Sequence, residues 1–107
     1  MIATGPRVAF EQIEGLGTDS NISYIGTPQG AMRTRERWER FVKDPGPAVI
    51  GAAQAAGCTG AAYEFLFNFE KDCRDAGIRD KVKITWITPE PYLGHFGIQG
   101  IRGGEKL

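Results

Sequence analysis

The sequence predicts a small α/β protein with parallel strands, in which one βαβ crossover is accompanied by one additional, charged helix. Three segments lead to this prediction. Ala48–Ile50 is apolar and ends in a glycine, Gly60–Ala76 repeats apolar residues at helical spacing, and Lys83–Thr88 is alternating and rich in β-branched residues. A strand, a helix and a strand within about 40 residues form one crossover unit, whose two strands run parallel.

The first 30 residues are expected to form short extended pieces separated by turns. Met1–Thr4 is apolar and stops at Gly5-Pro6, which is typical of the end of a strand. Val8–Phe10 is a second short extended candidate. The glycines and polar residues over positions 15–21 then predict a loop.

A charged helix is predicted to begin at Thr27-Pro28, because a hydroxyl can cap the first turn and proline fits the first helical position. The stretch Gln29–Lys43 carries seven charged side chains and keeps only a narrow apolar face. A charge run of this kind usually lies on a solvent-exposed helix face. We expect the helix to stop at Asp44–Pro47, since proline cannot continue it.

A second helix is expected to begin near Cys58 or Gly60 and to end at Ala76, with Gly77 as its C-terminal stop. Its apolar side chains follow the i, i+3, i+4, i+7 rule and form one stripe. Tyr63 and Phe67 widen this stripe onto a second face, so the helix should contact more than one neighbour. The stripe consists of Ala62, Phe65, Leu66, Phe69, Cys73 and Ala76.

Charge and cysteine content exclude several classes of protein. Thirteen basic and 13 acidic residues give a net charge of zero, which argues against a protein held on nucleic acid by bulk charge. No apolar run approaches the roughly 18 residues of a membrane-spanning helix, and Met1 is not followed by a secretion signal. Cys58 and Cys73 fit no zinc-binding spacing, so we expect no metal site and two reduced thiols in a cytoplasmic protein.

The turn after the first strand matches a dinucleotide-binding turn only in part. In such a turn, small residues at Gly-x-Gly-x-x-Gly spacing let backbone N–H groups approach a pyrophosphate at a helix N-terminus. The run Gly51–Ala56 has one of the three glycines and alanine at the other two positions. It is compatible with nucleotide binding by an incomplete Rossmann-like unit, and equally with a tight connection that needs small residues only for packing.

Three side chains are candidates for chemistry. Cys58 lies at a helix start, where the helix dipole favours a thiolate, whereas Cys73 on the apolar stripe fits an inert buried thiol. Glu64 has aromatic neighbours and could act as an acid or base, or could pair with a basic side chain. His95, the single histidine, lies in a glycine-flanked loop, where a histidine is usually only solvated.

Three runs together resemble the sulfide:quinone oxidoreductases. They are Val49–Gln54, Cys58 followed by Ala62–Phe65, and Thr88–Gly97, of which Glu-Pro-Tyr-Leu-Gly-His is the most specific part. Members of this family are FAD-dependent flavoproteins of the pyridine nucleotide-disulfide oxidoreductase type, which pass two electrons from sulfide to a membrane quinone. The resemblance implies an internal fragment. Residues 1–26 would be the end of an FAD-domain strand with a connecting loop, and residues 27–107 a partial second dinucleotide-binding domain with a loose C-terminal tail.

The resemblance also implies roles for individual residues. Cys58 matches one of two redox cysteines, and Glu64 and His95 match a carboxylate and an imidazole that handle protons. Thr4 and Gly5 match a strand end that lies against the flavin nucleotide. FAD is expected to bind the full-length enzyme and not this chain alone, because the family's pyrophosphate-binding turn would precede these residues. Peripheral membrane association would likewise belong only to the intact enzyme.

Two positions depart from the family pattern. The second redox cysteine falls at Gly26, and a nearby histidine falls at Gly30. These glycines favour a second hypothesis, a non-catalytic nucleotide-binding or interaction module derived from the same scaffold. A disulfide reductase that uses NAD(P)H is a weaker alternative, because the sequence holds no Cys-x-x-Cys pair.

The chain alone is expected to be marginally stable and to self-associate. Parallel sheets are normally covered on both faces, whereas this chain offers one crossover helix and one charged helix. The side chains that should be covered are Tyr63, Phe67, Trp86 and Ile87.

Overall fold

The computed structural model describes Ala3, Gly5 and residues 7–17, 20–56 and 58–95. Of the expected strand end at Met1–Thr4, only Ala3 is among these residues, and most of the glycine-rich tail lies outside them. The chain divides into two compact units, Met1–Trp38 and Glu39–Leu107, which we describe separately. This division falls inside a helix, whereas the predicted domain boundary between residues 26 and 27 concerns the architecture of a larger protein and stays a prediction.

The first unit begins with a single 3-10 turn, η1 (Phe10–Gln12). Our expectation that Phe10 belongs to an extended segment was therefore wrong. The backbone satisfies itself locally instead, as the Gln12 N–H donates to the Ala9 carbonyl at 3.1 Å and the Ile13 N–H to the Phe10 carbonyl at 3.2 Å. The Phe10 ring then meets the Tyr24 ring edge-on, with the centroids 5.4 Å apart.

Helix α1 (Pro28–Phe41) begins as predicted. The Thr27 hydroxyl accepts the Gly30 N–H at 3.1 Å, which is the hydrogen bond of an N-terminal cap. The helix ends two residues before the predicted Lys43. At its end, the Arg40 carbonyl accepts hydrogen bonds from the N–H groups of both Lys43 and Asp44, just before Pro45.

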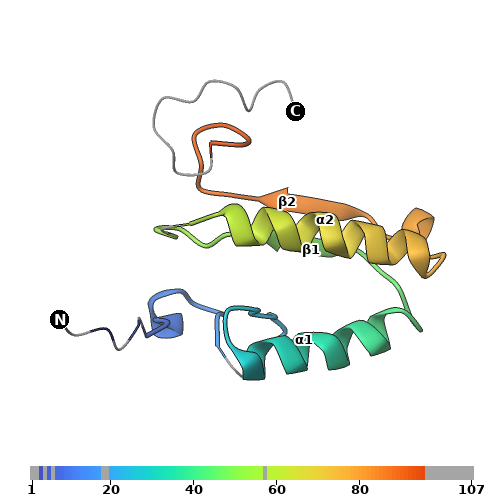
Figure 1. The fold of residues 1–107 in the computed structure, drawn as a ribbon, viewed down its shortest axis with the longest axis horizontal. Coiled ribbons are helices and arrows are strands. Elements are labelled where there is room, and N and C mark those ends of the chain that lie inside the picture. The colour runs from blue at the N-terminus through green and yellow to red at the C-terminus, as the bar shows by residue number, and fades with distance from the viewer. Residues whose placement is uncertain (1–2, 4, 6, 18–19, 57, 96–107) are drawn as a thin grey trace. The chain divides into compact units, whose positions relative to one another are not determined.

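The second unit holds the predicted βαβ crossover (Figure 1). Strands β1 (Ala48–Gly51) and β2 (Ile84–Ile87) are parallel neighbours, in a register that pairs Ile50 with Trp86. Helix α2 (Gly60–Asp75) and the short turn η2 (Arg79–Lys81) connect them. The α/β fold with parallel strands and one extra charged helix is thus confirmed.

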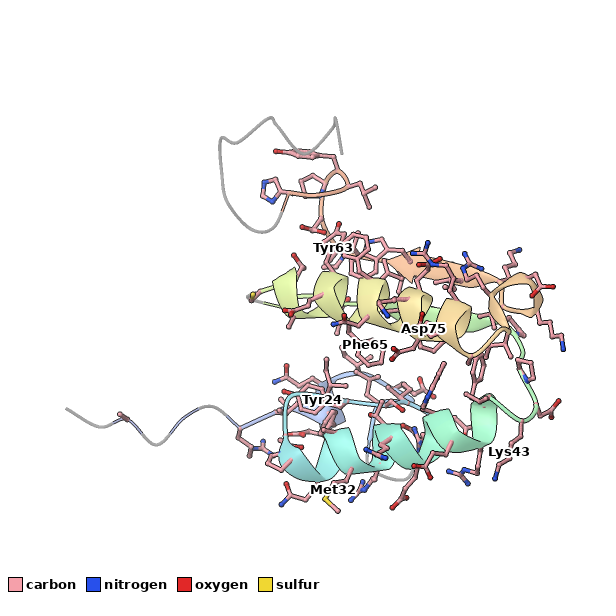
Figure 2. The ribbon with its side chains drawn as sticks, turned by 45° about the vertical axis from the view of Figure 1, so that its right-hand side comes forward. Tyr24, Met32, Lys43, Tyr63, Phe65 and Asp75 are labelled. Atoms are coloured by element: carbon pink, nitrogen blue, oxygen red, sulfur yellow. The ribbon has the colours of Figure 1, made fainter. Side chains whose placement is uncertain are left out.

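One face of the two-stranded sheet packs against α2 (Figure 1). The buried apolar residues are Tyr63 and Cys73 on α2, Ile78 after the helix and Val82 before β2. Figure 2 shows the Tyr63 side chain on the β2 side of α2 and Phe65 on the opposite side. The helix therefore presents apolar groups to more than one side, as the widened stripe predicts.

Gly77 ends α2 with a left-handed backbone, at φ 68°. Its N–H donates to the Arg74 carbonyl at 3.0 Å, and the Ile78 N–H donates to the Cys73 carbonyl at 2.9 Å. These two bonds form a Schellman motif, in which glycine avoids the cost of a Cβ atom. The motif turns Ile78 back into the core beside Cys73.

The other face of the sheet carries exposed apolar side chains. Along both strands burial alternates, so Val49 remains 66% exposed and Ile87 54% exposed, with Thr85 between them. We call these three residues the exposed sheet face. Phe67 on α2 is also 67% exposed. Among the described residues, no helix is long and apolar enough to cross a membrane.

Candidate functional site

An open hollow of about 260 Å³ lies where the two strands end. One wall is the connection from β1 to α2, and the other is the segment that follows β2. In α/β sheets, the carboxyl ends of parallel strands are the usual place for ligands. The described residues that line the hollow are Ala55, Ala56, Cys58, Thr59, Pro89, Glu90, Pro91 and His95.

The Glu90 carboxylate joins the two walls of the hollow. Its Oε1 accepts a hydrogen bond from the Thr59 hydroxyl at 3.0 Å. Its Oε2 accepts one from the Tyr63 hydroxyl at 2.8 Å and one from the Thr88 hydroxyl at 2.8 Å. Three hydroxyl donors from the α2 start, the first turn of α2 and the end of β2 therefore converge on one side chain.

Tyr63 extends this network to the residue before His95. The Tyr63 hydroxyl accepts the Gly94 N–H at 3.0 Å while it donates to Glu90. Its ring lies 4.2 Å from the Trp86 ring, centroid to centroid, so the side chain is held between α2 and β2. Burial is the main cause that raises the pKa of the Tyr63 phenol above its ordinary value of 10.0, and the Glu90 carboxylate adds to the increase. The phenol is thus kept as a hydrogen-bond donor.

The two cysteines lie in different environments. Cys58 is exposed on the rim of the hollow, one residue before the Thr59 cap position of α2. Cys73 is fully buried on the opposite end of the helix stripe. Burial raises the pKa of the Cys73 thiol above its ordinary value of 9.0. Both the access and the ionisation of Cys73 are therefore suppressed.

The structure brings Cys58 and His95 to one hollow but places Glu64 elsewhere. His95 is half-buried, and its ring meets the Tyr92 ring edge-on at 4.9 Å between centroids. Glu64 is exposed on α2 and is not among the described lining residues. The carboxylate that does line the hollow is Glu90, for which our sequence analysis proposed no role. A charged residue between two prolines, three positions after the end of a strand, is the signal that could have indicated it.

Gly51, the last residue of β1, is required for a packing reason. A Cβ atom on Gly51 would collide with the backbone carbonyl of Ile87 on the neighbouring strand. Ala55, on the rim of the hollow, adopts a left-handed backbone at φ 60°, which costs a non-glycine residue about 1 kcal/mol. Close pairing of the two strands thus explains Gly51. The strained backbone of Ala55 lies at the hollow.

Of the two residues matched to the flavin nucleotide, Thr4 lies outside the described residues. Gly5 is exposed and has a left-handed backbone at φ 78°. No described atom lies within 4 Å of the place where its Cβ would be. Its open backbone is compatible with the close approach of a nucleotide. In the described part of the chain, no cluster of His, Cys, Asp or Glu could hold a metal ion.

Tyr24 occupies the space beside both glycines that depart from the family pattern. A Cβ atom on Gly26 would collide with the ring end of Tyr24, and one on Gly30 would collide with the Tyr24 backbone carbonyl. The ring end can rotate away, but the carbonyl cannot. A side chain at position 26 is therefore feasible here, whereas one at position 30 requires the backbone to move.

Comparisons with known proteins find similarity over the whole length of the chain. No protein-family model matches it. Over all 107 residues the sequence is 41% identical to the sulfide-quinone reductase of Aquifex aeolicus (strain VF5), of which it covers 24%. The crystal structure of the sulfide:quinone oxidoreductase from the hyperthermophilic bacterium Aquifex aeolicus matches 88% of this chain and 22% of its own, with a TM-score of 0.79 and 40% identity.

The chain resembles one segment of a sulfide:quinone oxidoreductase. Sequence and fold agree on this family, and the family resemblance expected from the sequence is confirmed. The chain spans about a quarter of the length of its curated relative. By its name, that relative is an oxidoreductase that acts between sulfide and a quinone, and this chain is similar to one segment of it.

We predict that iodoacetamide alkylates Cys58 at least tenfold faster than Cys73 at pH 6.5, since only the deprotonated thiol reacts and Cys73 is enclosed. Peptide mapping by mass spectrometry over a time course measures both rates. In a Cys58→Ser variant, Cys73 should stay as slow as before. Equal rates, or a faster reaction at Cys73, would contradict this assignment.

Proposed function

We propose that this chain is a segment of a sulfide:quinone oxidoreductase-like flavoprotein, in which Cys58 is the sulfur-carrying thiol. The observation that carries the proposal is an exposed cysteine on the same hollow as the single histidine, His95, at the carboxyl ends of two parallel strands. The 41% identity over the whole chain supports the same assignment. Residues 1–26 would belong to the FAD domain, and residues 27–107 to part of the second dinucleotide-binding domain.

The proposed chemistry is the oxidation of sulfide at Cys58. A sulfur–sulfur bond forms between sulfide and the Cys58 thiolate, which releases two electrons and a proton. His95 and Glu64 are the groups proposed to handle protons. Bound FAD would take up the electron pair before a quinone receives it, with Thr4 and Gly5 beside the nucleotide. The intact enzyme would act in the cytoplasm, at the membrane surface where its quinone lies.

The glycines at positions 26 and 30 support a second candidate function. With Tyr24 beside both positions, this chain keeps the scaffold but not the second cysteine. A non-catalytic nucleotide-binding or interaction module is therefore the alternative. The two candidates differ in whether Cys58 takes up sulfur.

We predict that the purified chain retains no FAD after gel filtration, whereas a chimera that carries these 107 residues in place of the matching segment of the Aquifex aeolicus relative does. The reason is that one segment supplies only part of a cofactor site. Flavin absorbance relative to protein measures the occupancy. The unmodified relative serves as the control for assembly. Stoichiometric flavin on the chain alone, or a folded chimera without flavin, would contradict the proposal.

We also propose that the chain alone self-associates through the exposed sheet face of Val49, Thr85 and Ile87. Replacement of Ile87 by threonine keeps a β-branched residue and lowers the apolar area, so it should shift sedimentation profiles towards the monomer. The matched control is Ile22→Thr in the first unit, where another exposed isoleucine lies. A monomeric wild-type chain, or equal shifts in both variants, would refute this interface.

A further inference from the structure

We propose that Glu90 is a positioning residue, whose carboxylate sets the place of Cys58 on one wall of the hollow and of the His95 backbone on the other. The inference rests on the proposed role of Cys58 and deepens it. Glu90 itself would neither carry sulfur nor transfer a proton. It would act through Thr59 on one side and through Tyr63 on the other.

The Thr59 hydroxyl supports the first half of this proposal. Thr59 occupies the cap position of α2, where a threonine normally accepts a backbone N–H from the first turn, a bond worth about 1 kcal/mol. Here it makes no such cap bond, and its hydroxyl donates to Glu90 at 3.0 Å. Thr59 is only 4% exposed and is bonded directly to Cys58 along the chain. The bond to Glu90 thus takes the place of the helix cap beside Cys58.

The Tyr63 hydroxyl supports the second half. This hydroxyl donates to Glu90 and accepts the Gly94 N–H, and Gly94 immediately precedes His95. The phenol itself is fixed, because Tyr63 is 6% exposed and its ring packs on Trp86. One carboxylate therefore connects to the residues adjacent in sequence to both Cys58 and His95, which line the same hollow.

The three bonds require an acceptor at both carboxylate oxygens. Oε1 is used by Thr59, and Oε2 is shared by Tyr63 and Thr88. A glutamine has the same shape but offers one acceptor oxygen and one amide donor, so it cannot accept all three hydroxyls as they are placed. Glu90→Gln is for that reason a substitution that breaks the connection with the least change in packing.

The test is the rate of Cys58 alkylation by iodoacetamide between pH 6 and pH 9, compared with that of a free peptide of residues 54–62. We expect the alkylation rate of Cys58 in the wild-type chain to differ at least threefold from its rate in the peptide. Glu90→Gln and Thr59→Val should each bring it within twofold of the peptide, and the double variant should add nothing further because both changes break one connection. Glu36→Gln, which makes the same carboxylate-to-amide change on an exposed side chain of α1 outside the network, should leave the rate at the wild-type value.

Cys73 reports on folding in the same samples. If Glu90→Gln exposes Cys73, the Thr59→Val variant decides, because it keeps the charge and the core intact. A wild-type rate equal to that of the peptide would overturn the proposal. So would a Thr59→Val variant with unchanged Cys58 kinetics, additive effects in the double variant, or exposure of Cys73 in both single variants. None of these outcomes depends on flavin binding, so a failure of the proposed function in the chimera remains distinguishable.

Discussion

The convergence of three hydroxyl groups on the Glu90 carboxylate holds together the two connections that follow β1 and β2. Thr59, Tyr63 and Thr88 come from separate parts of the crossover, and each donates to the same side chain. Without this acceptor, three partly buried hydroxyls would each lose the hydrogen bond that they donate to Glu90, at about 1 kcal/mol each. The geometry of the hollow, and with it the approach of any ligand to Cys58 and His95, depends on this interaction.

The regular elements were predictable because their signals are local. The alternation in β2, the stripe on α2, the cap at Thr27 and the stop at Gly77 each rest on residues close in sequence. The Glu90 network was not predictable in the same way. It joins residues up to 31 positions apart, which meet only after the parallel strands have paired. Phe10 was misjudged for a related reason, since a short apolar run fits a 3-10 turn as well as a strand.

The candidate site shows the same division between local and distant signals. The sequence placed Cys58 at a helix start, and the hollow that it shares with His95 follows from the topology of the crossover. The proposed role of Glu64 rests on its aromatic neighbours in sequence and on the family resemblance. The roles of Thr4 and Gly5 at the cofactor rest on the resemblance alone. In the first unit, Tyr24 lies where side chains at positions 26 and 30 would project. Gly26 and Gly30 stand where the family resemblance would place a second cysteine and a histidine.

Hydrogen–deuterium exchange of the Gly94 backbone amide tests most directly whether the hydrogen bonds of Glu90 and Tyr63 fix the two walls of the hollow. Gly94 lies in a turn, where an amide normally exchanges quickly, but its N–H donates to the buried Tyr63 hydroxyl. We predict that NMR finds this amide at least tenfold more protected than that of Leu93, and that Tyr63→Phe removes the difference while Cys73 stays protected from alkylation. Equal exchange of the two amides in the wild-type chain would contradict the account, because Glu90 would then have no hold on the backbone beside His95.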